Sequence, residues 1–147
     1  REALHQLYDR STYGLKALIT NRGRDGKKLS AFDLGFIIGP CINAAGRLGD
    51  AKTSLEFLLE TDSFKANERA IELLNINNTR KDMTEQGTKT AIGLLETSDH
   101  LLMGAVPETG VAALSDRVLV MYIPKLHESL VGIIAGRIKE RYYRSLL

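Results

Sequence analysis

The spacing of apolar residues predicts a helix near the start of the chain. Leu15, Leu18 and Ile19 recur at positions that share one helix face. Ser11 or Thr12 precedes them and can accept a hydrogen bond from the first turn. We therefore expect a helix that begins there and ends just before the next glycine.

A capping pattern predicts a second, short helix. Ser30 and Asp33 have the spacing of a capping box, which favours a helix through about Phe36. The segment that follows, residues 39–49, contains three glycines and two alanines. Because these side chains are small, another backbone or a ligand can approach this segment closely.

A third helix is predicted from Asp50 to about Glu60. Asp50 is a favoured residue type at the N-cap position. Leu55, Leu58 and Leu59 occupy neighbouring positions on the helix surface, so we expect them to form its buried stripe.

The longest helical pattern covers residues 62–98. Phe64, Ile71 and Leu74 make its first part amphipathic, and its end is apolar again, whereas residues 77–90 are almost entirely polar. Because a helix that is polar on all sides commonly bridges two domains, we interpret this element as a connecting helix. At about 1.5 Å per residue it would be roughly 55 Å long.

The last third of the chain changes to an α/β pattern. Residues 99–115 are expected to be irregular. Arg117–Ile123 is a short apolar run that predicts a buried strand, and Leu130–Tyr143 repeats apolar residues at helical spacing. A strand, a loop and a helix form half of a parallel α/β unit. Because only four residues follow Tyr143, we expect this unit to lack its return strand.

Composition and charge are those of an ordinary folded protein. Apolar residues make up 44% and charged residues 26% of the 147 residues, which argues against disorder. The net charge is +2, so the overall charge does not indicate a polyanionic partner. One cysteine excludes an internal disulfide, and no apolar run approaches the ~20 residues of a membrane helix. We expect a soluble intracellular protein and, because the chain begins with Arg1 rather than Met, a piece of a longer one.

The sequence contains no complete catalytic or metal-binding motif. Its three histidines, His5, His100 and His127, lie far apart, and no DxD, HxxxH or CxxC pattern occurs. Neither a phosphate-binding GxxxxGK[ST] loop nor a GxSxG elbow is present. We therefore predict that these residues form neither a metal site nor a catalytic centre.

The region around the last predicted helix is the first candidate binding site. A loop that enters a helix at Gly132 would present unpaired backbone N–H groups to an anion, with His127 in the loop and Arg137 on the helix. From Arg137 to Leu147 there are four basic residues and one acidic residue, a local charge of +3. The alternative is a solvated helix surface whose basic residues suit a helix C-terminus.

Arg47, in a predicted turn of small residues, is the second candidate. Its guanidinium could bind a phosphate through two hydrogen bonds, or it could bond loop carbonyls as a structural residue. Asn43 could orient this loop or a ligand, or it could cap a helix. Cys41 is interpreted as a small buried residue, and the polar run at residues 77–82 as a solvated helix face.

Two long motifs resemble the DHH phosphoesterase family. Residues 36–49 read FIIGPCINAAGRLG, which is similar to the family motif GPRINAAGRLG. Residues 126–137 read LHESLVGIIAGR, which resembles the motif WHxGVVGIVAxR. Residues 75–80 are also similar to an LN..R signature on the family's long connecting helix. The likeness covers nearly the whole chain, in the right order.

The resemblance implies an α/β fold that is mostly helical in this stretch. Residues 1–61 would close the DHH domain, residues 62–98 would form the connecting helix, and residues 99–147 would open the DHH-associated domain. It implies a cytoplasmic hydrolase that requires manganese or magnesium and degrades single-stranded DNA from its 5′ end in recombination and repair. The metal-binding aspartates would precede this stretch, so we expect the chain alone to bind no metal and to be inactive.

The resemblance also assigns nucleic-acid-binding residues. Asn43 and Arg47 match motif positions that face the DNA cleft. His127 and Arg137 match the cleft-facing motif of the second domain, and Gly132 belongs to the same motif. No membrane contact is implied, and protein partners are not indicated.

Three residues depart from the family motifs. Ser129 replaces the usual glycine before the last helix, and Ser145 replaces a proline near its end. Cys41 stands where the family has an arginine, which removes a cation from the DNA cleft. We therefore expect Cys41→Arg to tighten oligonucleotide binding and to steepen its salt dependence.

Two alternatives remain open from the sequence. The chain could derive from another DHH phosphodiesterase that acts on short oligonucleotides or cyclic dinucleotides, although the first motif is nearly complete here. It could also derive from a non-catalytic relative that only binds nucleic acid or protein. The loss of the motif arginine at Cys41 favours this second alternative, and intact aspartates upstream would argue against it.

Overall fold

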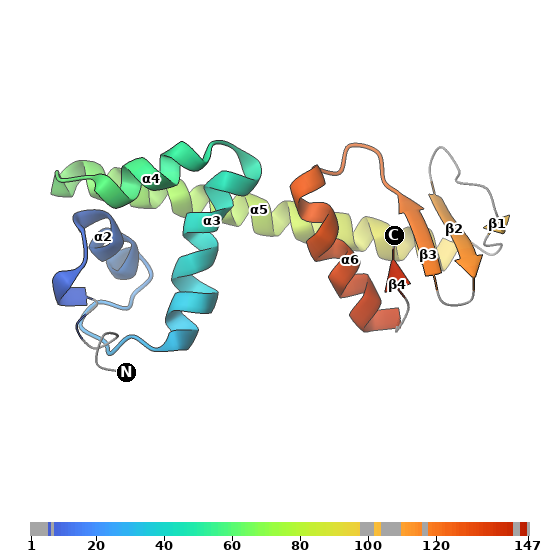
Figure 1. Cartoon of the computed structure of the whole chain (residues 1–147), viewed down its shortest axis with the longest axis horizontal. Coiled ribbons are helices and arrows are strands. Elements are labelled where there is room, and N and C mark those ends of the chain that lie inside the picture. Colours follow the sequence, from blue (N-terminus) through green and yellow to red (C-terminus); the bar gives the residue numbers. More distant parts are fainter. Residues whose placement is uncertain are drawn as a thin grey trace. The chain divides into compact units, whose positions relative to one another are not determined.

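The chain is mostly helical with one small sheet, as the sequence predicted (Figure 1). A computed structural model describes residues 6, 8–97, 102–103, 110–115, 118–142 and 145–146. It divides into two compact units, residues 1–80 and residues 81–147. None of the described helices is long and apolar enough to cross a membrane.

The first unit is built from helices, some of which begin at the predicted caps. They are α2 (Tyr13–Asn21), η1 (Asp33–Ile38), α3 (Gly39–Leu48), α4 (Ala51–Leu59) and the first part of α5 (Ser63–Thr97). Thr12 Oγ1 accepts a hydrogen bond from the backbone N–H of Leu15 (3.4 Å), and Asp50 Oδ1 accepts one from Lys52 (2.8 Å). Both caps were predicted from residue type alone.

The predicted short helix does not end at Phe36 but continues into α3. Its η1 segment has π-helical hydrogen bonding, in which the N–H of Gly39 bonds to the carbonyl of Leu34 five residues earlier. Pro40 lies in the first turn of α3. A proline removes one backbone donor and clashes with the carbonyl four residues before it. The π-turn changes the hydrogen-bond register just before Pro40, so the chain remains helical through the small-residue segment.

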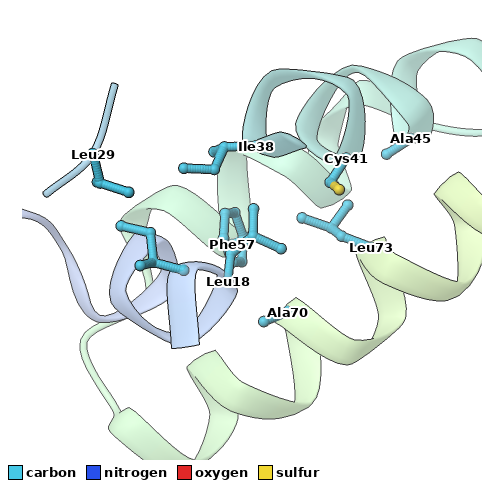
Figure 2. Close-up of a cluster of buried hydrophobic side chains, with 9 residues drawn as sticks. Leu18, Leu29, Ile38, Cys41, Ala45, Phe57, Ala70 and Leu73 are labelled. Carbon is cyan, nitrogen blue, oxygen red and sulfur yellow. The ribbon is translucent and has the colours of Figure 1, made fainter. Parts of the chain in front are cut away.

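The core of the first unit gathers residues from every one of these helices (Figure 2). Phe57 of α4 is fully buried, and Ser54 beside it donates a hydrogen bond to the carbonyl of Ile42. The prediction that Leu55 and Leu59 form the buried stripe is wrong, because they are 56% and 68% exposed. The buried core cluster consists of Leu18, Ile19, Leu29, Ile38, Cys41, Ala45, Phe57, Ala70 and Leu73.

Helix α5 confirms the predicted long helix but buries another face in its first part. Asp62 Oδ1 caps it by accepting hydrogen bonds from Phe64 N (2.8 Å) and Lys65 N (2.9 Å). The buried residues are spaced three or four apart: Ala66, Ala70, Leu73 and Asn77. Phe64 is 71% exposed. The polar run that begins at Asn77 is therefore not a purely solvated face.

The second unit contains a mixed four-stranded sheet. Its elements are β1 (Leu102–Met103), β2 (Gly110–Ser115), β3 (Val118–Tyr122), α6 (Glu128–Tyr142) and β4 (Ser145–Leu146), and the strand order is β1-β2-β3-β4. Strand β2 pairs antiparallel with β3, with a register shift between Ala113 and Ser115. The prediction that residues 99–115 are irregular is therefore wrong for β2.

A short return strand is present after α6. Strand β4 pairs in parallel with β3, in the register Val118 with Ser145 and Leu119 with Leu146. The expectation that the unit lacks its return strand is wrong, because two residues of that strand suffice to pair with β3. The segment β3-α6-β4 is thus a parallel crossover unit.

Gly87 permits close packing inside the second unit. It is buried on α5, and a Cβ atom at this position would lie 2.5 Å from Cδ1 of Ile134 and 2.9 Å from Cδ1 of Leu126. Ile134 and Leu130 of α6 are buried. The glycine therefore makes room for the side chains of α6 and of the preceding loop.

The capping box at Ser30 makes a pH-dependent contribution to stability. The N–H and Oγ of Ser30 donate to Asp33 Oδ2 (2.8 and 2.7 Å), the N–H of Asp33 donates to Ser30 Oγ (3.2 Å), and Arg24 pairs with Asp33 Oδ1 (3.1 Å). The hydrogen bonds from Ser30, and then the charge of Arg24, hold the pKa of Asp33 below its ordinary value. Stability from this carboxylate is therefore present above its ordinary pKa and is lost as the pH falls through the lowered pKa.

We expect Ser30→Ala to lower the melting temperature more at about pH 7 than at about pH 3. The reason is that the hydrogen bond from the Ser30 hydroxyl favours the ionised form of Asp33, so its loss matters most where Asp33 is ionised. Thermal melts at the two pH values measure this difference. Ser30→Thr keeps a hydroxyl and should keep the wild-type difference between the two melts. An equal loss at both pH values in Ser30→Ala would contradict the assignment.

Candidate nucleic-acid interface

Asn43 and Arg47 lie together on the exposed side of α3. They are four residues apart, so they share one helix face, and both side chains are exposed. The predictions that Arg47 lies in a turn and that Asn43 caps a helix are wrong, because α3 continues to Leu48. The helix places an amide and a guanidinium next to each other at the surface.

Cys41 lies on the other, buried side of the same helix. Its Sγ accepts a hydrogen bond from Arg22 Nη2 (3.1 Å) and one from Asn77 Nδ2 (3.5 Å), and its S–H donates to the carbonyl of Ile37 (3.1 Å). The thiol is 0% exposed. A buried residue was predicted here, but the expectation that an arginine at this position would reach DNA assumed an exposed side chain, and that premise is wrong.

His127 stands at the start of α6 and caps it. The backbone N–H of Ser129 donates to His127 Nδ1 (3.4 Å), and Ser129 Oγ lies 2.8 Å from the same nitrogen. The N–H of Leu130 donates to the carbonyl of His127 (2.9 Å). With Nδ1 accepting, the neutral ring carries its proton on Nε2, which can donate to a ligand. Ser129, the departure from the family glycine, therefore fixes the ring of the neighbouring histidine.

The loop before His127 is a tight turn with a strained residue. The N–H of Leu126 donates to the carbonyl of Ile123 (3.4 Å), Pro124 is the second residue of the turn, and Lys125 has a φ of 65°. This is the pattern of a type II turn, whose third position usually holds glycine. Lys125 was not predicted as a binding residue, although a proline followed by a polar residue is a turn signal. The turn presents a lysine beside the histidine.

Gly132 does not lie at the helix entrance. Helix α6 begins at Glu128, so Gly132 lies beyond the first four amides, which are the ones a helix leaves unpaired. The prediction that its N–H is open to an anion is wrong for this reason. Gly132 is exposed, and nothing lies within 4 Å of the place where its Cβ would be. The surface of α6 therefore carries no side chain at this exposed position.

Arg137 is exposed on α6 and lies close to an acidic group of α5. The pKa of Glu85 is lowered first by its hydrogen bond to Lys89 and, more weakly, by the charge of Arg137. Glu85 and Lys89 form an ion pair (2.7 Å). The negative charge of Glu85 therefore offsets part of the positive charge that Arg137 could offer to a ligand.

Each unit has a cavity near the predicted residues. A cavity of about 200 Å³ is lined by Lys125 and His127 together with residues of α5. In the first unit a larger groove of about 610 Å³ lies between the α3–α4 corner and α5, and its acidic lining residues are Asp50, Glu68 and Glu72. Carboxylates repel a phosphate backbone, so the larger groove does not suit nucleic acid.

The described residues contain no group of three or more His, Cys, Asp or Glu side chains that could hold a metal ion. His5 and His100 lie outside the described residues. The donor set of a divalent metal site is therefore not assembled by the part of the chain that the structure describes.

Curated relatives with similar sequences share one name. The chain is 41% identical over 138 residues to the single-stranded-DNA-specific exonuclease RecJ of Escherichia coli, covering 91% of this chain and 22% of that protein. It is 32% identical over 144 residues to RecJ of Thermus thermophilus, covering 98% of this chain and 19% of that protein. The chain therefore spans about a fifth of the length of these relatives. No protein-family model matches it.

Solved structures agree with these sequence matches. A crystal structure of exonuclease RecJ bound to manganese is 30% identical, with a TM-score of 0.75 over 99% of this chain and 32% of that chain. RecJ from Thermus thermophilus in complex with Mg²⁺ is also 30% identical, with a TM-score of 0.75 over 99% of this chain and 20% of that chain. In both sequence and fold, this chain matches one stretch of the RecJ single-stranded-DNA-specific exonucleases.

Proposed function

We propose that this chain is part of a metal-dependent exonuclease that degrades single-stranded DNA from its 5′ end. The observation that carries the proposal is the match to RecJ in both sequence and fold over nearly the whole chain. In this proposal the chain contributes residues that hold the DNA strand, and the protein acts in the cytoplasm in recombination and repair. Single-stranded DNA is its partner.

In the proposed enzyme, Mn²⁺ or Mg²⁺ ions activate water and stabilise the charge on the scissile phosphate when they are bound. We propose that the ligands of these ions come from residues outside the part of the chain that the structure describes. We further propose that residues 1–61 close the DHH domain and that residues 99–147 open the DHH-associated domain. The bounds of α5, Ser63–Thr97, support residues 62–98 as the connecting helix.

The chain's own residues would bind the strand through its phosphates. Arg47 offers a guanidinium that can donate two parallel hydrogen bonds to one phosphate, and Asn43 adds a neutral amide on the same helix face. His127 can donate from Nε2, and Arg137 adds positive charge near the exposed Gly132. These contacts involve the backbone of the nucleic acid, so binding should not depend on base sequence.

We expect the purified chain to bind an unstructured oligothymidylate without degrading it in the presence of Mn²⁺. Arg47→Gln should weaken binding about five-fold and reduce the slope of log K against log salt by about 0.7, the value for one phosphate contact on a single strand. Fluorescence anisotropy over a salt series measures both quantities. Gel analysis of the same mixtures detects hydrolysis.

Lys52→Gln is the matched control, because Lys52 is an exposed basic residue that pairs with Glu56 on α4. It should bind DNA as the wild type does. Equal effects of the two substitutions would refute a specific role for Arg47. Hydrolysis by the purified chain would refute the assignment of the metal ligands to other residues, and a wild-type chain without affinity for DNA would refute the proposed binding role.

A further inference from the structure

Arg22 is an arginine whose charge is balanced by no acidic side chain among the residues that the structure describes. It follows the last residue of α2, and its backbone N–H bonds to the carbonyls of Leu18 (3.1 Å) and Ile19 (3.2 Å), which fixes where the side chain starts. The side chain is half-buried. Its Nη2 donates to Cys41 Sγ (3.1 Å), a weak and neutral acceptor.

One atom of Arg22 is left without any partner. Its Nε is buried and makes no hydrogen bond, and in the described part of the chain no other buried side-chain nitrogen or oxygen is in this state. A buried donor without a partner is unfavourable, and such groups in native proteins commonly mark the place of an ion or water. The vacant donor therefore points to a missing acceptor.

Two other half-buried arginines of the same unit form ion pairs with acidic side chains. Arg24 pairs with Asp33 (3.1 Å). Arg69 pairs with Glu56 (2.7 Å) and Glu60 (3.1 Å). Among the described residues, Arg22 forms no such ion pair. Its negative partner is thus not part of the described fold.

A second guanidinium belongs to the same hydrogen-bonded chain. Asn77 is 1% exposed, donates to Cys41 Sγ (3.5 Å) and accepts a hydrogen bond from Arg80 Nε (3.2 Å). Arg22, Cys41, Asn77 and Arg80 therefore form one continuous chain of hydrogen bonds between the end of α2, α3 and α5. Two positive groups flank a neutral thiol and a neutral amide.

We propose that Arg22 and Arg80 together bind one backbone phosphate of single-stranded nucleic acid. Arginine is the side chain best suited to this task, because its planar fork of donors matches the phosphate oxygens. Asn77 and Cys41 are positioning residues that orient the two guanidinium groups. The subsite rests on the proposed function, and it differs from the Asn43–Arg47 face because Cys41 lies on the buried side of α3.

The first test measures binding of a 3′-fluorescein-labelled oligothymidylate to the 147-residue chain by anisotropy over about 50 to 200 mM salt. Arg22→Gln and Arg80→Gln should each weaken binding about five-fold and reduce the salt slope by about 0.7, and the double variant should add little, because both residues hold one phosphate. Lys28→Gln, an equal change of charge at an exposed residue, should bind as the wild type does. Wild-type affinity and slope in Arg22→Gln would overturn the proposal.

The second test does not depend on DNA. Inorganic phosphate should raise the melting temperature of the wild-type chain by about 3 °C relative to chloride of equal ionic strength, and Arg22→Gln should abolish this rise. A merely structural arginine would instead lower the melting temperature in chloride when it is replaced. Arg22→Lys keeps the charge without the fork and should keep only part of the rise.

The two tests separate the subsite from the proposed function. If the wild-type chain does not bind DNA but is stabilised by phosphate through Arg22, the proposed function is refuted and the anion-binding subsite is still supported. A wild-type chain that binds DNA through Arg47 while Arg22→Gln changes neither binding nor the effect of phosphate would overturn the subsite alone.

Discussion

Gly14→Ala is expected to destabilise the first unit by about 3 kcal/mol or more, because overpacking against a backbone cannot be relieved by a change of rotamer. Gly14 is buried in α2 where this helix crosses α4. A Cβ atom there would overlap the carbonyl oxygen of Phe57 and lie 3.2 Å from its ring. Since Phe57 is fully buried in the core, neither helix can move away without opening that core. The higher helix propensity of alanine recovers only about 1 kcal/mol.

Thermal unfolding followed by circular dichroism measures this effect, which should appear as a fall of roughly 10 °C in the melting temperature. Gly35→Ala is the matched control, because Gly35 is helical and exposed and nothing lies within 4 Å of its Cβ position. That variant should be as stable as the wild type or more stable by up to about 1 kcal/mol. A melting temperature of Gly14→Ala equal to that of the control would contradict the close crossing of α2 and α4.

Local signals in the sequence predicted most of the helices. The caps at Thr12, Ser30 and Asp50 depend only on residues within the next turn, so residue type and spacing identify them. Strand β3 and helix α6 were also predicted, because a short β-branched run and a helical repeat are each visible in one segment. The fold class followed from these elements.

Features that depend on contacts between distant segments were not predicted. Strand β2 reads GVAALS, whose glycine, alanines and serine have weak strand propensity, and it is a strand because β3 pairs with it. Four of the five residues from Leu55 to Leu59 are apolar, so the repeat does not show which of them face the core. Asn77 is polar yet buried, because Cys41 and Arg80 satisfy its amide.

At the candidate site, too, local sequence signals were predictive and contacts between distant segments were not. Asn43 and Arg47 were selected from a motif, but their environment was misjudged, because the small residues around Arg47 suggested a turn where α3 continues to Leu48. The sequence did not single out Arg22 as a binding residue. Nothing in its spacing reveals that its guanidinium reaches a sulfur 19 residues away.

Cys41→Arg is the second change with a large expected effect, and its direction differs from what the sequence suggested. The new guanidinium would replace a fully buried thiol and would meet the guanidinium of Arg22, which already lies against the sulfur. The added charge would be buried without an anionic partner, and the space is too small for the longer side chain. The substitution should therefore lower the free energy of unfolding by about 3 to 5 kcal/mol. In this chain, then, Arg22 and an arginine at position 41 compete for one place.

This competition gives a test by double-mutant cycle. In an Arg22→Ala background, the arginine at position 41 gains the space and loses the repulsion, so Cys41→Arg should cost about 1 to 3 kcal/mol less than it does alone. Denaturant unfolding of the four chains measures this coupling. Cys41→Ala serves as a control, because it adds no charge: its coupling to Arg22→Ala reflects only the hydrogen bond from Arg22 to the sulfur and should stay below about 1 kcal/mol. If Cys41→Arg costs the same in both backgrounds, the two side chains do not share a site.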